Sequence, residues 1–249
     1  MTPLSAAHRG ISSLAQENTE TGIILSIEKK VDIIDLDIMS TNDGNIVLCH
    51  DENVKDMVVG HKDTFIKTLK RAEIAKLVIA KETGTGKYNT TNHFSFLDEV
   101  FDKYLDRIIF WLDIKDSNYR PWQSQCQIAT LLADFLGSRK DKLKRVIVSS
   151  TNPFVIIAFR KLVQQQNFLD KLTFGFDYGI NDTCCISCIV WSKIFENCYG
   201  SNYVTMSKSL LTQNKINDYK NRDIKVMPYA YPKGTSPPFE NIYGYLMDY

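Results

Sequence analysis

The stretch IIDLDIMSTNDGNIVLCHD, residues 33–51, decides the fold, because acidic residues interrupt an otherwise apolar run. Side chains alternate along a strand, so Asp35 and Asp37 share one face with Ile33. The opposite face is wholly apolar and consists of Ile34, Leu36 and Ile38. This pattern predicts a strand that packs on helices with one face and points two carboxylates inward with the other.

The segment TNDGN, residues 41–45, predicts a tight hairpin turn after this strand. Gly44 tolerates the positive φ that such a turn requires. The chain then returns through NIVLCH, residues 45–50, which brings His50 back beside the two acids.

Outside this stretch, strand-like and helix-like segments alternate. Strand-like runs cover residues 3–8, 31–39, 45–50, 107–115, 145–150, 171–178, 202–208, 224–231 and 242–249. Helical patterns cover residues 19–30, 95–105, 121–139, 153–165 and 183–197. This alternation predicts parallel strands and therefore an α/β fold, a (β/α)8 TIM barrel with a small hairpin or insertion after the second strand. An open doubly wound sheet is the alternative.

Length and composition predict a single domain that spans residues 1–249. A chain of 249 residues with 44% hydrophobic content can bury a large core, and it has no internal repeat or long linker. Its net charge is +1, from 30 basic and 29 acidic residues, so we expect no nucleic-acid partner. Any recognition of anions must be local. The sequence does not indicate an oligomeric state.

No segment suits a membrane span or a secretion signal. The longest apolar stretches, such as FVIIAF at 154–159, are far shorter than the roughly 18 residues that a span requires. The amino end MTPLSAAHRG lacks a basic region followed by an apolar one. We therefore expect no transmembrane segment and, if no leader precedes the chain, a cytoplasmic location.

Six cysteines occur, and in such a chain we expect free thiols. Cys184, Cys185 and Cys188 lie close together in an apolar stretch. We expect them to pack in the core, because no second Cys or His pair has the spacing of a zinc site.

A second acidic strand, RIIFWLDIKD, repeats the first pattern. Asp113 and Lys115 fall on one face of it, and the other face is apolar. In a barrel, Asp35, Asp37 and Asp113 would point inward near the carboxyl ends of their strands, where barrels place their active sites. Three carboxylates, with no Cys or His at ligand spacing beside them in the sequence, suit Mg²⁺, Ca²⁺ or Mn²⁺. The alternative is that Arg9 and Lys115 neutralise them in salt bridges.

Two of the four histidines close strand-like runs, His8 after PLSAA and His50 after NIVLC. Together with Arg9, Lys115 and the inward acids, they would form a cleft with a metal, an acid, a base and anion-binding cations. Phosphodiester cleavage needs this set of groups. The phosphate charge must be neutralised, the nucleophile must lose a proton and the leaving oxygen must gain one.

At these residues the sequence resembles the glycerophosphodiester phosphodiesterase family, within the phospholipase C-like phosphodiesterase barrels. The family's ordered motifs read here as His8-Arg9-Gly10, Glu17-Asn18-Thr19, Asp35-Leu36-Asp37, Thr41-Asn42-Asp43-Gly44, His50-Asp51 and Asp113-Ile114-Lys115. The match is dense over residues 6–51, moderate up to residue 152 and weak beyond it.

The resemblance implies a (β/α)8 phosphodiesterase that uses a divalent metal to hydrolyse a glycerophosphodiester to an alcohol and glycerol 3-phosphate. It places Asp35, Asp37 and Asp113 at the metal, His8 and His50 in acid and base catalysis, and Arg9 and Lys115 at the phosphate of a small-molecule substrate. It does not assign acid and base between the histidines.

The sequence departs from the family pattern at both ends of the site. Asp35 and Asp113 stand where the family has Glu, and each is shorter by one carbon–carbon bond of about 1.5 Å. The carboxyl end lacks the family's W-T-V-N strand and has VMPYAYPKG instead. Tyr229 or Tyr231 would supply an aromatic wall there.

Two other functions stay open. The first is a phospholipase D-like, sphingomyelinase D-like or sugar-phosphodiester enzyme, or a phosphodiester-forming transferase, on the same barrel. The second is a weakly active barrel that binds a phosphorylated ligand, which the two Asp-for-Glu departures would favour.

Overall fold

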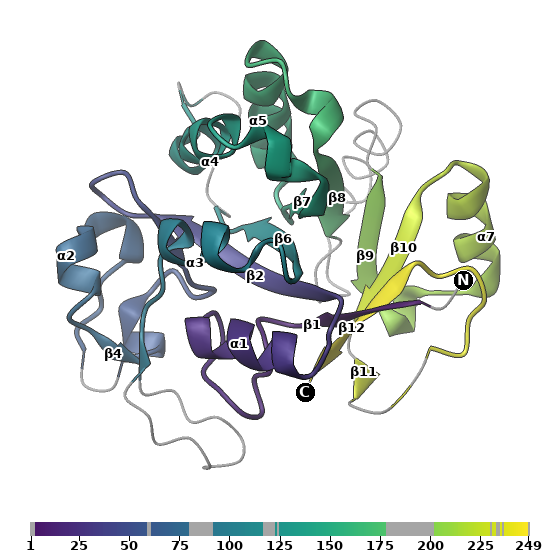
Figure 1. The fold of residues 1–249 in the computed structure, drawn as a ribbon, viewed down its shortest axis with the longest axis horizontal. Helices are drawn as coiled ribbons and strands as arrows, with labels where there is room; N and C mark the ends of the chain where they lie inside the picture. The colour runs from purple at the N-terminus through teal and green to yellow at the C-terminus, as the bar shows by residue number, and fades with distance from the viewer. Residues whose placement is uncertain are drawn as a thin grey trace.

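Among the residues that the structure describes, eight parallel strands form a nearly closed barrel in the computed structural model (Figure 1). Around the barrel they follow the order β1 (Leu4–Ala7), β2 (Ile33–Ser40), β6 (Ile109–Ile114), β7 (Val146–Ser149), β8 (Thr173–Asp177), β9 (Tyr203–Ser207), β10 (Lys225–Tyr229) and β12 (Gly244–Asp248). Strand β12 pairs with β1, and the Tyr243 backbone N–H donates to the Val226 carbonyl at 3.0 Å beside β10. The predicted barrel is confirmed, and the alternative, an open doubly wound sheet, is wrong.

The structure describes residues 3–58, 61–79, 92–116, 123, 125–177, 202–229, 231–232, 235 and 237–248. The predicted helix 183–197, with Cys184, Cys185 and Cys188, lies outside this range. Within it, Cys49 and Cys126 are buried free thiols, as expected.

Helices connect the strands largely where the helical spacing of apolar residues predicted them. They are α1 (Glu20–Glu28), α3 (Leu97–Tyr104), α4 (Gln127–Gly137), α5 (Pro153–Gln165) and α7 (Gln213–Asn221). The Thr19 hydroxyl caps α1 by accepting from the Gly22 N–H, and Asn152 caps α5 in front of a proline. Helix α4 begins at Gln127, later than residue 121. Helix α7 was not predicted, because only Ile216 and Tyr219 of it are buried.

The predicted hairpin follows β2. Strand β3 (Ile46–Leu48) runs antiparallel to β2, and Gly44 takes φ +80° in the turn. The insertion after β3 holds short elements that the sequence pattern did not predict: α2 (Arg71–Ile74), β4 (Val78–Ile79), β5 (Asn92–His93) and two 3-10 turns, Val54–Asp56 and Ile66–Thr68. It buries its own apolar cluster around Val47, Ile66 and Phe96, which ties it to the barrel.

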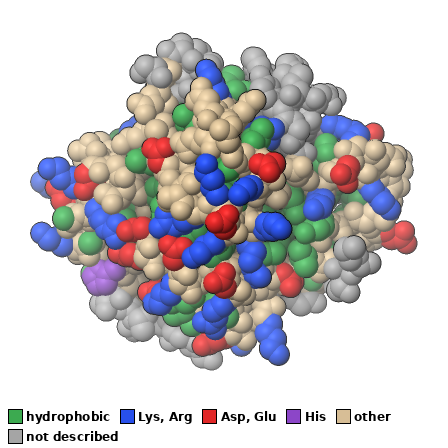
Figure 2. Space-filling view, turned by 45° about the horizontal axis from the view of Figure 1, so that its top comes forward, with side chains coloured by type: hydrophobic (Ala, Val, Ile, Leu, Met, Phe, Trp, Pro, Cys, Tyr) green, Lys and Arg blue, Asp and Glu red, His purple; other side chains and the backbone are tan. Residues whose placement is uncertain are grey.

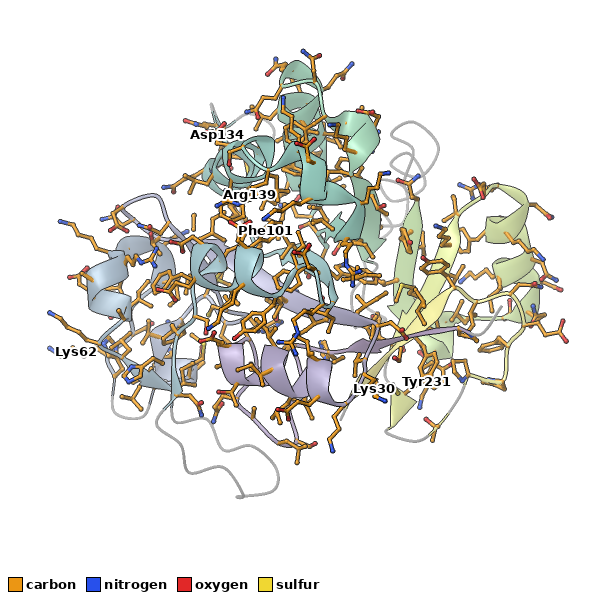
Figure 3. The ribbon with its side chains drawn as sticks, in the orientation of Figure 1. Lys30, Lys62, Phe101, Asp134, Arg139 and Tyr231 are labelled. Atoms are coloured by element: carbon orange, nitrogen blue, oxygen red, sulfur yellow. The ribbon has the colours of Figure 1, made fainter. Side chains whose placement is uncertain are left out.

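Strand alternation sorts the core as predicted. The apolar faces of β2 and β6 join the large cluster beneath the helices. There Phe101 of α3, labelled in Figure 3, packs edge-on against Phe110 with ring centroids 5.7 Å apart. Ile33 and Trp111 instead enter the cluster inside the barrel. The inward positions above this cluster are polar, which leaves the carboxyl end of the barrel for a site.

The surface agrees with the small net charge. Figure 2 shows basic and acidic side chains interspersed over one face of the molecule. None of the described helices is both long and apolar enough to cross a bilayer.

Candidate active site

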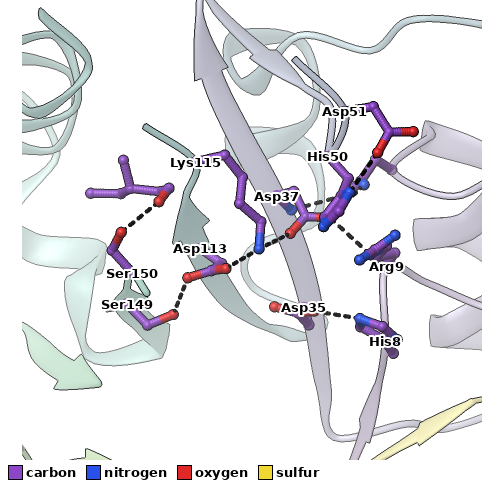
Figure 4. Close-up of polar contacts among 12 residues, drawn as sticks. His8, Arg9, Asp35, Asp37, His50, Asp51, Asp113, Lys115, Ser149 and Ser150 are labelled. Carbon is purple, nitrogen blue, oxygen red and sulfur yellow. Dashed lines mark hydrogen bonds and ion pairs between the residues drawn. The ribbon is translucent and has the colours of Figure 1, made fainter. Parts of the chain in front are cut away.

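The seven predicted site residues come together at the carboxyl ends of neighbouring strands (Figure 4). They are His8 and Arg9 after β1, Asp35 and Asp37 on β2, His50 after β3, and Asp113 and Lys115 at the end of β6. The register aligns the acids, because Asp37 pairs with Asp113 across β2 and β6. Residues 76 positions apart in the sequence are therefore neighbours.

Asp37 is the most heavily compensated acid of the group. It is 1% exposed, and its carboxylate lies 3.1 Å from Arg9 Nε and 3.0 Å from Lys115 Nζ. The Arg9 contact is an ion pair without hydrogen-bond alignment, whereas the Asn18 amide donates a hydrogen bond at 2.9 Å. Burial alone would raise the pKa of Asp37, but Lys115 and Arg9 hold it well below its usual range.

Lys115 bridges two acids. Its ammonium lies 2.5 Å from Asp113 Oδ2, besides its contact with Asp37. Burial lowers the pKa of Lys115, but the facing carboxylates raise it well above its ordinary value. The facing carboxylates therefore favour the charged form of Lys115 between β2 and β6.

Asp35 has a more distant partner. It is 6% exposed, and its ion pair among the described residues is with His8 Nε2, at 4.0 Å. Burial and the charge of Asp37 raise the pKa of Asp35 from 3.8 to about 7. A buried carboxylate in this state favours a proton or a cation beside it.

Arg9 is held in an unusual backbone conformation. Its φ is +54°, and Gly10 follows at +91°. The turn lies so close to α1 that a Cβ on Gly10 would be only 3.1 Å from the Gly22 Cα, which favours glycine at this position. The Arg9 guanidinium pairs with Glu17 through Nη1 at 3.2 Å. The turn thus fixes the guanidinium between Glu17 and Asp37.

His50 is oriented by its own neighbour. Its Nδ1 lies 2.8 Å from the Asp51 carboxylate, which favours the tautomer with a proton on Nδ1. The Nε2 atom is then the nitrogen suited to accept or donate a proton in the site. A nearby pocket of about 10 Å³, lined by Glu17, His50 and Met57 among others, has room for one water molecule.

The charge balance of the site fits a divalent cation. Within the set Arg9, Glu17, Asp35, Asp37, Asp113 and Lys115, carboxylates outnumber cations by two. The described part of the chain contains no group of three His, Cys, Asp or Glu side chains already arranged to ligate an ion. The salt bridges of the alternative interpretation are present on Asp37 and Asp113, whereas the ion pair of Asp35 among the described residues is with His8, at 4.0 Å. The oxygen donors suit a hard cation such as Mg²⁺ or Ca²⁺.

Sequence reasoning assigned no role to four residues that hold the site together. Asn18 binds Asp37, and Glu17 binds Arg9. Asp51 orients His50, and Ser149 binds Asp113. The first three lie within the quoted motifs, which was the available signal. Ser149 ends a strand whose alternation places it inward, and it pairs with Asp113 in register.

Tyr229 and Tyr231, the two residues predicted for an aromatic wall, face opposite sides of the barrel. Tyr229 ends β10 and packs toward the cluster inside the barrel, in which Met227 of the same strand face lies. Tyr231 starts β11 (Tyr231–Pro232), which pairs with β12, and it packs edge-on against Tyr245 at 6.0 Å. The register matches Tyr231 with Met247 and Met247 with Ala7, whose side chain faces outside the barrel. Tyr231 therefore faces away from the site.

Comparisons with known proteins agree with the family resemblance and with the barrel fold. The model of the Glycerophosphoryl diester phosphodiesterase family matches residues 8–233. Lysophospholipase D GDPD3 of Mus musculus is 31% identical over 117 residues, 45% of this chain and 34% of that protein. A glycerophosphodiester phosphodiesterase of Bacillus subtilis is 24% identical over 163 residues, 64% of this chain and 56% of that protein. The matched regions thus span between one third and three fifths of these two relatives.

A solved structure shares the fold. The Oleispira antarctica phosphodiesterase in complex with the product sn-glycerol-3-phosphate has a TM-score of 0.70 and 19% identity, covering 99% of this chain and 93% of that one. At this identity the likeness shows the barrel alone. The family match covers most of the chain, including the motifs that carry the site. The protein therefore belongs to the glycerophosphoryl diester phosphodiesterase family.

Proposed function

We propose that the protein is a metal-dependent phosphodiesterase that hydrolyses glycerophosphodiesters to an alcohol and glycerol 3-phosphate. The observation that carries this proposal is the gathering of two histidines, two cations and three inward acids at one end of the barrel (Figure 4). A phosphodiesterase needs these groups together, and family membership supports this use of them.

Asp35, Asp37 and Asp113 would hold a divalent cation, Mg²⁺ or Ca²⁺, with Mn²⁺ as a third choice. When bound, such an ion neutralises charge on the phosphate oxygens. The raised pKa of Asp35 supports this assignment, because its carboxylate gains most from an added positive charge.

Arg9 and Lys115 would bind the phosphate oxygens. Both side chains are held in place by acids, 14% and 18% exposed respectively, so their charges are positioned before a substrate arrives. Preorganised cations of this kind stabilise a charged transition state without reorganising during the reaction.

His8 and His50 would move the protons. One histidine takes a proton from the nucleophile, and the other gives a proton to the leaving alkoxide oxygen. The nucleophile is water or the substrate's own adjacent hydroxyl, which would first give a cyclic phosphate. Asp51 supports a proton-transfer role for His50 by orienting its ring.

A lysophospholipase D activity is the second candidate. Its support is the relative of that name and the replacement of the family's W-T-V-N strand by a strand ending in Tyr229. A lysophospholipid carries an acyl chain on its glycerol, and the phosphate chemistry of the two candidates is the same.

One assay separates these candidates. The purified protein is incubated with glycerophosphocholine, glycerophosphoinositol or lysophosphatidylcholine, in Mg²⁺, in Ca²⁺ or in chelator. Release of glycerol 3-phosphate from the first two substrates, lost in chelator, is the expected result. Turnover of lysophosphatidylcholine alone would favour the second candidate. Binding of glycerol 3-phosphate without turnover of any substrate would contradict both and leave a ligand-binding barrel.

A further inference from the structure

A chain of hydrogen bonds ends on Asp113 from inside the barrel. The Trp111 indole Nε1–H donates to the Ser149 hydroxyl at 2.7 Å, and the Ser149 hydroxyl lies 2.7 Å from Asp113 Oδ1. All three side chains are at most 4% exposed. The chain links β6 to β7 at the level where the two strands pair Asp113 with Ser149.

The direction of this chain is fixed by chemistry. An indole nitrogen can only donate, so the Ser149 oxygen is the acceptor of that bond. The single hydroxyl proton of Ser149 is then left for the Asp113 carboxylate. Asp113 Oδ1 thus accepts from Ser149, while Oδ2 faces the Lys115 ammonium at 2.5 Å. Both oxygens of the carboxylate therefore have a partner, and the carboxylate cannot rotate without breaking one of these two contacts.

The packing around Trp111 favours this geometry. Gly175 of β8 lies against it, and a Cβ at Gly175 would lie 3.3 Å from the Ser149 Cβ and 3.7 Å from the Trp111 ring. The absence of a side chain at this position leaves room for Ser149 beside the indole. The edge-on contact with Tyr203, at 6.3 Å, fixes the other side of the ring.

From these contacts we infer that Ser149 is a positioning residue for the reaction, which acts by holding Asp113 in the orientation that the site uses. The inference rests on the proposed function for its kinetic consequence. It also explains how a short acid serves where the family pattern has Glu, because the hydroxyl fixes the direction in which Asp113 Oδ2 points. Hydrogen-bond partners of ligating or catalytic groups typically contribute about 10- to 100-fold in activity.

The chain offers a matched control in Ser150. Ser150 is buried to the same extent, 1% exposed, and its hydroxyl donates to the Ile114 backbone carbonyl at 2.7 Å, away from the acids. Ser149→Ala and Ser150→Ala remove the same atom from adjacent buried positions. A loss caused by weakened packing or folding would appear in both variants.

The experiment compares kcat, KM and the crystal structure of the two variants with wild type. We expect Ser149→Ala to lower kcat about 10- to 100-fold with KM changed less than about threefold, and Ser150→Ala to keep kcat within about threefold. In the Ser149→Ala crystal, Asp113 Oδ1 should leave its present position.

Two outcomes overturn the inference. Equal kcat for the two variants would show that the Ser149 hydroxyl does no more than the Ser150 hydroxyl. An unmoved Asp113 in the Ser149→Ala crystal would show that Ser149 does not position it, and this result counts even if the wild type turns over no glycerophosphodiester. Wild-type inactivity by itself contradicts the proposed function, so the two failures are distinguishable.

Discussion

Asn18 and Asp37 hold each other by two reciprocal hydrogen bonds. The Asn18 side-chain amide donates to Asp37 Oδ2 at 2.9 Å, and the Asp37 backbone N–H donates to Asn18 Oδ1 at 2.9 Å. The pair joins the loop before α1 to the middle of β2, and Asn18 reaches it from a left-handed backbone with φ +57°. The loop that carries Arg9 and Glu17 is thereby locked to the acid that faces Lys115.

Replacement of Asn18 should therefore damage both stability and activity. Asn18→Ala breaks both bonds and leaves a buried backbone N–H on Asp37 without a partner. We expect the free energy of unfolding to fall by about 1–3 kcal/mol. Phosphodiester turnover should fall about 10- to 100-fold. Urea unfolding and initial-rate kinetics measure the two effects.

Asn167 provides the control for this variant. It also has a left-handed backbone, at φ +59°, but it is exposed and far along the chain from the site residues. Asn167→Ala should show only the backbone part of the stability loss and normal turnover. If both variants lose equal stability and neither loses activity, the Asn18 to Asp37 link has no functional role.

Asp35 and Asp37 should respond in opposite directions to loss of charge. The pKa of Asp35 is raised from 3.8 to about 7, so its contribution to stability is fully present below pH 4 and is lost as the pH rises through 7. The pKa of Asp37 is lowered, so its contribution is present above pH 4 and is lost as the pH falls below it. The sign of each shift thus predicts the sign of each mutation.

At pH 8 in chelator, Asp35→Asn should raise the free energy of unfolding by about 1–3 kcal/mol, because it removes a charge that burial and Asp37 disfavour. Asp37→Asn should lower it by about 3–5 kcal/mol, because Lys115 and Arg9 lose their shared partner. At pH 4 the Asp35 variant should approach wild type. Denaturant unfolding at the two pH values measures both effects, and equal destabilisation by the two variants at pH 8 would contradict the assignment.

Cation affinity should depend on pH in the range set by Asp35. Its carboxyl must lose a proton before it can ligate an ion, so a pKa of about 7 makes binding weaker below that pH. We expect the Mg²⁺ affinity to fall about tenfold per pH unit between pH 7 and pH 5 and to level off above pH 8. Calorimetric titration of the metal-free protein gives this profile directly.

The control for this titration is Asp32→Asn. Asp32 lies just before β2, at the opposite end of the strand, where it accepts hydrogen bonds from the Ser5 backbone and hydroxyl at 2.8 Å. This variant should keep the wild-type slope. An affinity independent of pH in the wild type would remove Asp35 from the ligands.

The alternation of side chains along a strand explains why so much of the site was predictable. A period of two fixes which residues face inward, and in a barrel the inward residues at the carboxyl ends converge. Asp35, Asp37, Asp113 and Lys115 could therefore be placed from spacing alone. The turn at Gly44 then fixed the return of the chain to His50.

The alternation rule gave no correct orientation where the chain changes its strand partner, between Tyr229 and Tyr231. In a continuous strand Tyr229 and Tyr231 would share a face, so the sequence left both as wall residues. The structure ends β10 at Tyr229 and starts β11 at Tyr231 on a different neighbour, which turns Tyr231 outward. Side-chain partners such as Ser149 were also out of reach, because they depend on the register between strands that are distant in the sequence.

The two strand-end histidines should be required for turnover, and the other described histidines should not. His8 lies beside Asp35 and His50 is oriented by Asp51, whereas His93 is exposed in the insertion, with Nδ1 near the Leu77 carbonyl. His8→Ala and His50→Ala should each lower kcat roughly 10²- to 10⁴-fold with unfolding close to wild type. His93→Ala should leave kcat unchanged. Steady-state kinetics on glycerophosphocholine measure the three variants, and near-normal turnover of either site variant would exclude that histidine from proton transfer.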